Sequence, residues 1–376
     1  MMKRHSFLFA TILSTAALGV VVRPAHAQPG AGMKLVSPEV GADRRVTFRL
    51  LAANAKDVKV AGDFTAQPLP MVKDNNGVWS YTTAALKPEI YGYYFQLEGR
   101  RVPDPGNLFA SNSNQYLKTY FEVPGDVPGY WAMRDTVPHG AVHEHYYNSA
   151  ELKATRRFLL YTPPGYSSSP DRSYPVLYLY HGAGDDERMW TRVGQANFVM
   201  DNLLAEGKAV PALIVMPFGH AVRNYKEGSN GGQPAVATIE KDLFGSVMPI
   251  VEKEYRVTKD ANHRAIAGLS MGGGQALSIG LNHPDKFAYV AAFSAPVRQA
   301  SQYRVLADSE QANKSLKLLW IGVGASDNMA GLSIRFHEEL DRKKIRHHWE
   351  LTQGGLHNWL VWRPYLRDVL TNLFKE

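Results

Sequence analysis

The chain has 376 residues, 45% of them hydrophobic and 20% charged, and it contains no cysteine. This composition is typical of a globular protein and excludes the disordered and fibrous classes, while the lack of cysteine excludes disulfides, thiol catalysis and zinc–thiolate sites. The formal net charge is +7, but the basic residues are spread along the chain, without the basic stripe interleaved with aromatic residues that nucleic-acid binding would require.

The first residues have the pattern of a secretory signal peptide. Lys3 and Arg4 precede an apolar stretch over residues 7–22, and Ala-His-Ala at 25–27 is a small-x-small cleavage site. We expect residues 1–27 to be removed on export to the periplasm or the medium, which takes away three basic residues and lowers the net charge from +7 to +4. An uncleaved membrane anchor is the alternative, although the stretch is short for a membrane span.

Residues 28–125 are predicted to form a small all-β sandwich. Short runs of alternating apolar and polar residues are separated there by turn residues, and several short strands at near-regular spacing are typical of such a sandwich. The predicted strands are RVTFRLLA (45–52), VKVAGDF (58–64), GVWSYTT (77–83) and YGYYFQLEG (91–99). Residues 126–140 follow as a proline-containing linker that packs on its neighbours.

Residues 141–376 show strands that alternate with helices, which predicts an α/β fold. The strands are nearly continuous apolar runs, as expected for a mostly parallel sheet covered by helices on both faces. Reactive residues in such sheets lie beyond the carboxyl ends of the strands. We predict strands within 156–166, 174–182, 211–219, 263–268, 287–295, 317–327 and 346–355, and helices within 239–255, 271–283, 332–344 and 362–376.

The stretch AIAGLSMGGGQAL at 265–277 places Ser270 between a predicted strand and a predicted helix. A sharp turn between the two forces the residue at its apex into a strained conformation and leaves no room for side chains two positions away, which gives Gly268 and Gly272 a steric reason. Such a turn would display the Ser270 hydroxyl at the edge of the sheet as a nucleophile. The alternative is a glycine-rich helix start without chemical importance.

A serine nucleophile needs a histidine to accept its proton and a carboxylate to orient that histidine. Asp327 and His357 each follow the end of a predicted strand, so we expect them on the same edge as Ser270. The chain order Ser, Asp, His is that of the α/β-hydrolase topology. Three other carboxylates are rivals for the role of Asp327, although none directly ends an apolar strand: Asp260, Asp285 and Asp308.

The negative charge of a tetrahedral intermediate requires preorganised N–H donors, each typically worth about 2.7–4 kcal/mol. We expect one donor to be the backbone N–H of Met271, directly after the serine. A second should come from the loop YHGAGDDERMW at 180–190, where the N–H of Ala183 is favoured over that of Gly182. An ordinary strand-to-helix turn is the alternative interpretation of this loop.

Other patterns predict no cofactor and no metal. His139, His143 and His145 are spaced like metal ligands, but no carboxylate or cysteine accompanies them at a suitable spacing, and a linker role is favoured. The adjacent His347 and His348 are expected at the surface. The glycines at 228–234 do not follow a strand, so we expect a loop near the cleft there and no phosphate-binding motif.

Residues from about 140 onwards resemble the esterase-D-like carbohydrate esterases, which include feruloyl and acetylxylan esterases. The matching stretches are VHEHYYNS, YTPPGY, YPVLYLYHGAGDDERMW, YRVTKDANHRAIAGLSMGGGQAL, LLWIGVGASD and GGLHNWLVWR. The resemblance implies an α/β-hydrolase fold, with the catalytic and oxyanion roles given above, and we expect Gly182, Trp190 and Trp359 to bind substrate. Related esterases often have the histidine directly after the glycines, whereas GGLHNW has one extra residue before it. This difference affects the identity of the expected substrate more than the assignment of the triad.

The region before the linker resembles the small β-sandwich modules related to glycogen-binding domains, through VKVAGDF, NNGVWS and YYFQLEGRRVPDPGN. Where related modules often continue with a short turn and a tryptophan, AGDFTAQPLPM has none. Binding of a glycan by stacking needs an exposed aromatic side chain. We therefore expect this domain to be mainly a structural partner of the esterase, one that can line a wall of its cleft.

The sequence thus predicts an exported serine esterase that removes feruloyl or acetyl groups from plant-wall polysaccharide of the xylan type. The expected partners are acylated oligosaccharides or polysaccharides, with no nucleic acid and no stable membrane insertion after signal cleavage. Three alternatives stay open: hydrolysis of a siderophore trilactone of the enterochelin type, acyl transfer to a sugar, and glycan binding without catalysis.

Overall fold

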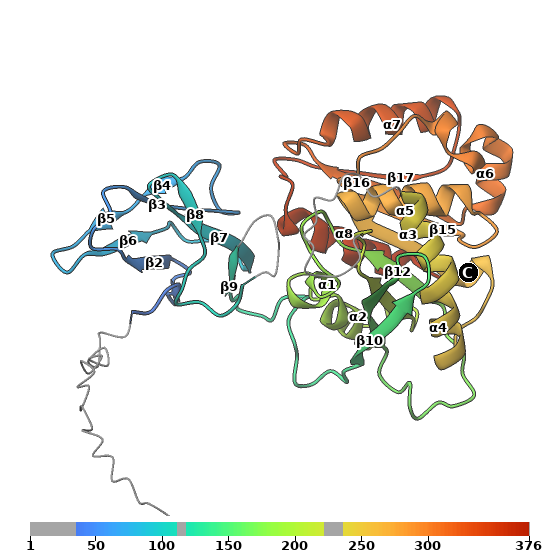
Figure 1. Ribbon diagram of the computed structural model, residues 1–376, viewed down its shortest axis with the longest axis horizontal. Helices are drawn as coiled ribbons and strands as arrows, with labels where there is room; N and C mark the ends of the chain where they lie inside the picture. Colours follow the sequence, from blue (N-terminus) through green and yellow to red (C-terminus); the bar gives the residue numbers. More distant parts are fainter. Residues whose placement is uncertain (1–34, 111–117, 222–235, 376) are drawn as a thin grey trace, which may run out of the picture. The chain divides into compact units, whose positions relative to one another are not determined.

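The structure of the protein is a computed structural model that describes residues 35–110, 118–221 and 236–375 (Figure 1). The expected signal peptide and the glycine-containing loop at 228–234 lie outside these residues. Within the described ranges, no helix combines the length and the apolar character needed to cross a bilayer.

The region before residue 125 forms two facing antiparallel sheets. One sheet has the strand order β1-β2-β6-β5, and the other has the order β4-β3-β7-β8, with β9 paired to β7. The strands are β1 (Glu39–Val40), β2 (Val46–Leu51), β3 (Val58–Gly62), β4 (Leu69–Pro70), β5 (Val72–Lys73), β6 (Val78–Thr82), β7 (Glu89–Leu97), β8 (Arg100–Val102) and β9 (Thr119–Val123).

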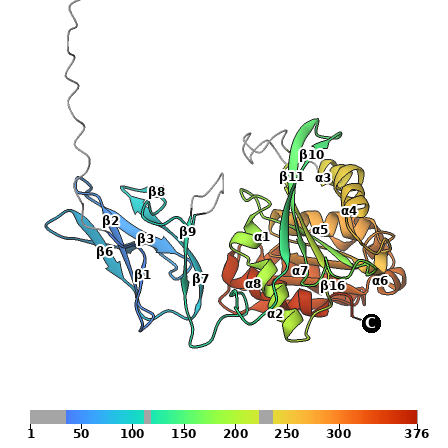
Figure 2. The same ribbon diagram turned by 90° about the horizontal axis from the view of Figure 1, so that it is seen from below.

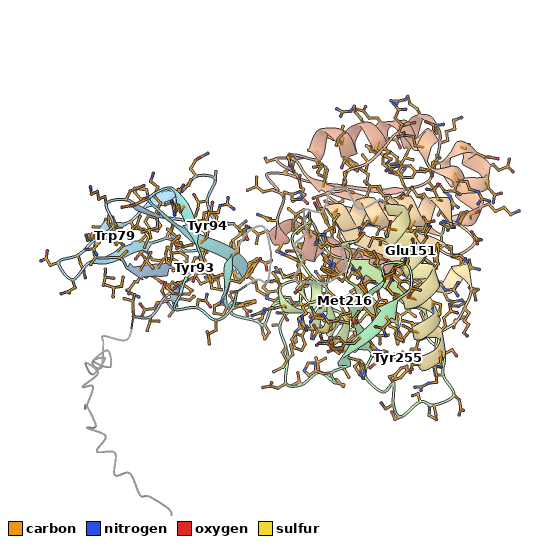
Figure 3. The ribbon with its side chains drawn as sticks, viewed as in Figure 1. Trp79, Tyr93, Tyr94, Glu151, Met216 and Tyr255 are labelled. Atoms are coloured by element: carbon orange, nitrogen blue, oxygen red, sulfur yellow. The ribbon has the colours of Figure 1, made fainter. Side chains whose placement is uncertain are left out.

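The sandwich is held together by buried aromatic side chains. Phe48 of β2 contacts Tyr93 of β7 and Phe121 of β9, with ring centroids 4.8 and 5.4 Å apart, and all three rings are at most 5% exposed (Figure 3 labels Tyr93). Rings of this size each bury a large apolar area, so the two sheets are joined by a packed core. The buried carboxylate of Asp104 accepts hydrogen bonds from the hydroxyls of Ser37 and Tyr93, which fixes the start of the domain to its core.

From residue 141 the chain forms an eight-stranded sheet in the order β10-β11-β13-β12-β14-β15-β16-β17. The six strands from β13 to β17 in this order are parallel, while β10 and β11 form a long antiparallel pair at one edge (Figure 2). Their bounds are β10 (Ala141–Ser149), β11 (Ala154–Thr162), β12 (Val176–Tyr180), β13 (Leu213–Pro217), β14 (Arg264–Leu269), β15 (Tyr289–Phe293), β16 (Leu318–Gly324) and β17 (His348–Thr352).

Helices cover both faces of this sheet. One core cluster joins α3, α4, α5, α6 and α7 to one face, and a second joins α1, α2 and α8 to the other. The helices are α1 (Met189–Arg192), α2 (Ala196–Ala205), α3 (Val236–Asp242), α4 (Met248–Glu254), α5 (Met271–Asn282), α6 (Ser309–Ser315), α7 (Ala330–Arg342) and α8 (Trp359–Asn372). The predicted mostly parallel sheet with helices on both faces is confirmed.

Three local features differ from the expectations. His143 and His145 lie on strand β10 and not in a linker, and the His145 ring stacks on Phe158 at 4.6 Å. The helix expected over 239–255 is interrupted by a π-helical turn, Leu243–Val247, shortly before Pro249, which lacks the N–H that a continuous α-helix requires. Helices α1, α2 and α6 were not among the predicted helices.

The sandwich and the eight-stranded sheet belong to one compact unit, Val36–Glu376. Arg363 of α8, with no exposed side-chain surface, forms an ion pair with Glu89 of β7 and donates to the carbonyl oxygen of Val193 at 2.9 Å. Its guanidinium also lies 5.6 Å from the ring of Trp131, in the segment between the two regions. A buried charge of this kind is stable only when it is paired and hydrogen-bonded, so these contacts tie the regions together.

Candidate active site

Ser270 stands at a sharp turn between β14 and α5. Its φ and ψ angles are 51° and −118°, a strained conformation for a residue with a side chain. A Cβ atom on Gly268 would lie 2.4 Å from the backbone of Gly272, and one on Gly272 would lie 2.5 Å from the carbonyl oxygen of His181. Only glycine fits at either position, as the sequence predicted, because strand β12, helix α5 and the turn approach one another so closely.

The structure brings Ser270, His357 and Asp327 together at the carboxyl ends of neighbouring strands. The His357 Nε2 atom lies 3.0 Å from the Ser270 Oγ atom, and its Nδ1 atom lies 2.9 and 3.0 Å from the two carboxylate oxygens of Asp327. The Asp327 side chain has no exposed surface, whereas 31% of the His357 side chain is exposed. This is the geometry in which a histidine can remove a proton from a serine hydroxyl while a carboxylate holds the ring in place.

The Asp327 carboxylate is kept ionised by its neighbours. Burial alone would raise its pKa, but hydrogen bonds from His357, the Met329 N–H group and the Ser294 hydroxyl together lower the pKa below its ordinary value. Ser294 in turn accepts a hydrogen bond from the Trp362 indole at 2.9 Å. Ser294 was not anticipated from the sequence, since nothing in the stretch FSA marks it as a partner of the carboxylate.

The rival carboxylates have other partners. Asp308 is the N-cap of α6, where it accepts hydrogen bonds from the N–H groups of Glu310 and Gln311. Asp260 pairs with His263 at 2.8 Å, and Asp285 lies 3.9 Å from Lys286. These positions leave Asp327 as the carboxylate that contacts His357.

Met271 is the first residue of α5, so its N–H group belongs to the helical turn whose donors have no acceptor within the helix. Ala183 and Gly182 lie in the loop after β12, and both line the same pocket as Ser270. Of the two predicted donors, Ala183 therefore lines the pocket that contains Ser270, and Met271 directly follows Ser270 in the chain.

His181 fixes the orientation of this loop. Burial, and then the neighbouring His220, lower the pKa of His181 to about 3, so the ring is neutral. Its Nε2 atom accepts the Gly219 N–H group at 2.9 Å, so Nδ1 carries the proton and donates to the Gly182 carbonyl oxygen at 2.8 Å. Because that carbonyl and the Ala183 N–H belong to one planar peptide group, His181 sets the direction in which this N–H points.

A pocket of about 440 Å³ opens onto Ser270 and His357. Gly182 and Trp359, two of the residues expected to bind substrate, line it. The third, Trp190, does not: its side chain has no exposed surface, donates to the Tyr180 carbonyl oxygen at 3.0 Å and packs edge-to-face on Trp359 at 5.0 Å. The expectation for Trp190 is therefore corrected, because its size and its indole N–H serve the core beneath the pocket.

The sandwich domain supplies one side of this pocket, with Tyr94, Arg101 and Lys118 among the lining residues. Arg101 lies over the ring of Tyr94 at 4.2 Å, and Lys118 pairs with Asp63 at 3.3 Å. These residues were not identified from the sequence, because only the folded chain brings them to the triad.

Asp185, from the HGAGDD loop, also lines the pocket. A Cβ atom built on Gly182 would lie 3.5 Å from the Asp185 Oδ2 atom and 3.6 Å from the Ser270 Cβ atom, so the Asp185 carboxyl group and the Ser270 side chain lie on two sides of the same point. Burial first, and then the charge of Asp186, raise the pKa of Asp185 to about 7, although Lys118 opposes the shift. At pH 7 about half of the Asp185 carboxyl groups therefore carry a proton.

Comparison with protein families matches both regions. Residues 149–373 match the family described as "Putative esterase", and residues 35–111 match carbohydrate-binding module 48, the isoamylase N-terminal domain. The resemblance to carbohydrate esterases preceded by a glycogen-binding-like module is thereby confirmed.

Three similar proteins show how far the likeness extends. An endo-1,4-beta-xylanase/feruloyl esterase of Xylanibacter ruminicola is 30% identical over 90% of this chain and 46% of the relative. A ferulic acid esterase structure has a TM-score of 0.56 and 28% identity over 62% of this chain and 97% of that one. The enterobactin esterase of Shigella flexneri has a TM-score of 0.66 at 20% identity, over 88% of this chain and 93% of that one.

The chain spans less than half the length of the curated relatives it matches, between 22% and 46% of the first three.

Proposed function

The chain belongs to the esterase family that residues 149–373 match, and on this premise we propose that it is a serine esterase with Ser270 as its nucleophile. The observation that carries the proposal is the pair of contacts made by His357, to the Ser270 hydroxyl at 3.0 Å and to the Asp327 carboxylate at 2.9 Å.

In the proposed reaction, Ser270 Oγ attacks the ester carbonyl carbon while His357 Nε2 takes the hydroxyl proton. The buried Asp327 carboxylate stabilises the imidazolium ion that results. The N–H groups of Met271 and Ala183 bind the oxyanion of the tetrahedral intermediate. His357 then returns the proton to the leaving alcohol, and a water molecule, activated by the same histidine, releases the acid from the acyl-enzyme.

The proposed substrate is an acylated plant-wall polysaccharide or oligosaccharide of the xylan type. The relative from Xylanibacter ruminicola combines xylanase and feruloyl esterase in its name, and this chain matches it at 30% identity. Among the acyl groups, the aromatic side chains of Tyr94, Trp359 and Trp362 around the pocket favour feruloyl over acetyl, because aromatic rings stack on one another. Export through the signal peptide at 1–27 is part of this proposal, since such substrates lie outside the cell.

The second candidate is hydrolysis of a siderophore trilactone. It is favoured by one observation: the enterobactin esterase structure is similar over 88% of this chain, a share that extends beyond the esterase region.

A rate panel with methyl ferulate, acetylated xylan and a catecholate trilactone distinguishes the candidates. We expect methyl ferulate to have the highest kcat/KM and the trilactone a value lower by roughly two orders of magnitude or more, the size of discrimination that a shaped pocket provides. A preference for the trilactone would establish the second candidate instead.

Ser270→Ala tests the mechanism in the same panel. Turnover should fall by several orders of magnitude while the substrate still binds, and Ser278→Ala, on the same helix α5, should retain full activity. Unchanged ester hydrolysis in Ser270→Ala would refute the nucleophile. A wild-type protein that binds xylan but hydrolyses none of the three esters would be a glycan-binding protein.

A further inference from the structure

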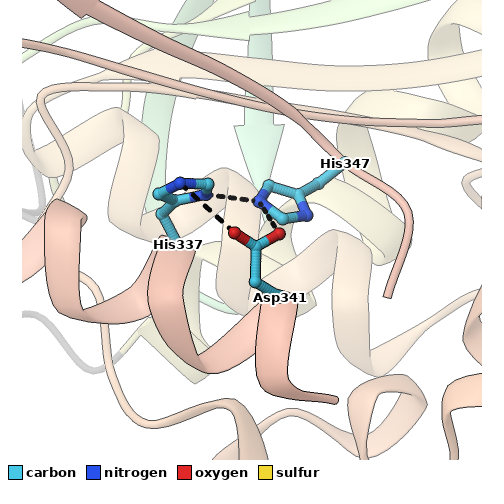
Figure 4. A group of neighbouring side chains, drawn as sticks. All are labelled: His337, Asp341 and His347. Atoms are coloured by element: carbon cyan, nitrogen blue, oxygen red, sulfur yellow. Dashed lines mark hydrogen bonds and ion pairs between the residues drawn. The ribbon is translucent and has the colours of Figure 1, made fainter. Parts of the chain in front are cut away.

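Helix α7 and strand β17 bring two histidines and a carboxylate together, away from the triad. His337 and Asp341 are four residues apart on α7 and so share one face of the helix. His347 directly precedes β17, and the three side chains point toward one another (Figure 4). Although His347 was expected at the surface, only 4% of its side chain is exposed.

The two histidine rings are held in place by neighbours outside the cluster. His347 Nδ1 lies 2.8 Å from the Ile345 carbonyl oxygen, which can only accept, so this nitrogen carries the proton and Nε2 presents a lone pair toward the cluster. A backbone carbonyl that fixes the tautomer in this way is the usual support of a metal-binding histidine. The His337 ring is stacked on Trp349, with centroids 4.6 Å apart and planes 5° apart.

The spacing of the ligand atoms matches that of a small divalent ion. One possible ligand atom from each of the three residues lies within 4.8 Å of the other two. His337 Nδ1 lies 2.8 Å from His347 Nε2, and an Asp341 oxygen lies 3.9 Å from His347 Nε2. The other ring nitrogen of His337, Nε2, lies 3.5 Å from the second Asp341 oxygen. Two nitrogens bound to Zn²⁺ at ~2.0–2.1 Å in a tetrahedral site are ~3.3 Å apart, so a shift of about half an ångström converts the hydrogen bond between the rings into a pair of ligands.

We propose that His337, His347 and Asp341 bind a divalent transition-metal ion of the Zn²⁺ type, with water as the fourth ligand. Zn²⁺ readily binds a set of two imidazoles and one carboxylate, whereas Mg²⁺ and Ca²⁺ prefer sets made of oxygen ligands alone. The expectation of no metal site considered only His139, His143 and His145. It missed this cluster because its ligands come from two elements.

The ion would act as a structural clamp. It joins the last turns of α7 to the start of β17, the two elements between Asp327 and His357 in the chain. Asp341 lies 11 residues beyond Ala330, the first residue of α7, or about 16 Å along the helix axis from the end nearest Asp327. Binding is therefore expected to stabilise the fold without taking part in ester hydrolysis.

Calorimetric titration with Zn²⁺ tests the proposal on the full chain, purified without a histidine tag and treated with a chelator. We expect one ion per chain, and a rise in melting temperature that grows with Zn²⁺ concentration. Asp341→Asn and His337→Gln should each lower the affinity by at least roughly tenfold. Both substitutions replace partly exposed side chains, so folding should persist, which circular dichroism would verify.

The matched control is His263→Gln. His263 and Asp260 also form an exposed histidine–carboxylate pair, at 2.8 Å, but they are not among the groups of three or more ligand residues found in the described part of the chain. This variant should bind Zn²⁺ as the wild type does. The absence of saturable binding, or binding that Asp341→Asn and His337→Gln leave unchanged, would overturn the proposal.

The ¹⁵N chemical shifts of the histidine rings provide an independent test of the ligand set. On addition of Zn²⁺, the Nε2 resonance of His347 should move to a metal-bound position while its Nδ1 stays protonated. A shift at His263 with none at His347 would refute the assignment.

Discussion

Gly272→Ala tests the claim that close packing around the turn positions the nucleophile. The new Cβ atom would lie 2.5 Å from the His181 carbonyl oxygen and 2.6 Å from that of Tyr180. Cβ atoms in proteins almost never lie closer than 3.0 Å to another heavy atom of this kind. Both contacts are to backbone, so helix α5 and strand β12 must separate by about 0.5 Å or more. Overpacking of this kind costs about 1–3 kcal/mol of unfolding free energy.

The same displacement moves Ser270 and the Met271 N–H away from the Ala183 side of the site. Since a shift of about 1 Å can cost roughly 100-fold in rate, we expect kcat on a small aryl ester to fall by about 10- to 100-fold. Urea unfolding and steady-state kinetics measure the two effects. The control is Gly245→Ala, in the π-helical turn, where a Cβ would meet no atom within 4 Å, so it should be neutral or slightly stabilising. Equal stability and rate for both variants would refute the reasoning.

Three further predictions concern the groups around the nucleophile. Asp327→Asn should lower kcat by up to roughly 10⁴-fold, whereas Asp308→Asn, which keeps a good N-cap, should leave it unchanged; the reverse result would reassign the carboxylate. His181→Phe should lower kcat by roughly 10²–10³-fold with little change in KM, because it releases an oxyanion donor, and a change confined to KM would contradict this. Burial raises the pKa of Asp185 to about 7, whereas the same carboxyl group in the unfolded chain loses its proton near pH ~4. Between pH ~4 and about 7 the folded chain therefore binds one proton more than the unfolded chain, and the stability of the wild type falls as the pH rises. Asp185→Asn removes this loss, so its gain in melting temperature over the wild type should be larger at pH 8 than at pH 5; equal gains would show that the carboxyl is not protonated.

Much of the catalytic edge could be predicted from local sequence. The apolar runs that end at Leu269 and Gly324 mark where buried strands stop, so Ser270 and Asp327 could be placed on one edge before any distance was known. The need for glycine at positions 268 and 272, two residues before and after Ser270, followed from a steric argument alone. These inferences succeed because each depends on neighbours a few residues away.

The remaining features depend on contacts between distant segments. Ser294 lies 33 residues before Asp327, and its role follows only from the pairing of β15 with β16. The resemblance placed Trp190 in the pocket, but its ring packs edge-to-face on Trp359 and has no exposed surface. Arg101 and Lys118 come from another domain altogether, and no local pattern distinguishes them from ordinary surface charges.

The contact between Arg363 and Glu89 has a practical consequence for anyone who shortens this protein. Cutting the chain at the apparent boundary near residue 125 would remove Glu89, the counter-ion of the Arg363 guanidinium, which has no exposed surface in the whole chain. An excised catalytic fragment should therefore be less stable than the same residues within the whole chain. The domain boundary that the sequence indicates is therefore crossed by an ion pair that joins the two regions of the folded chain.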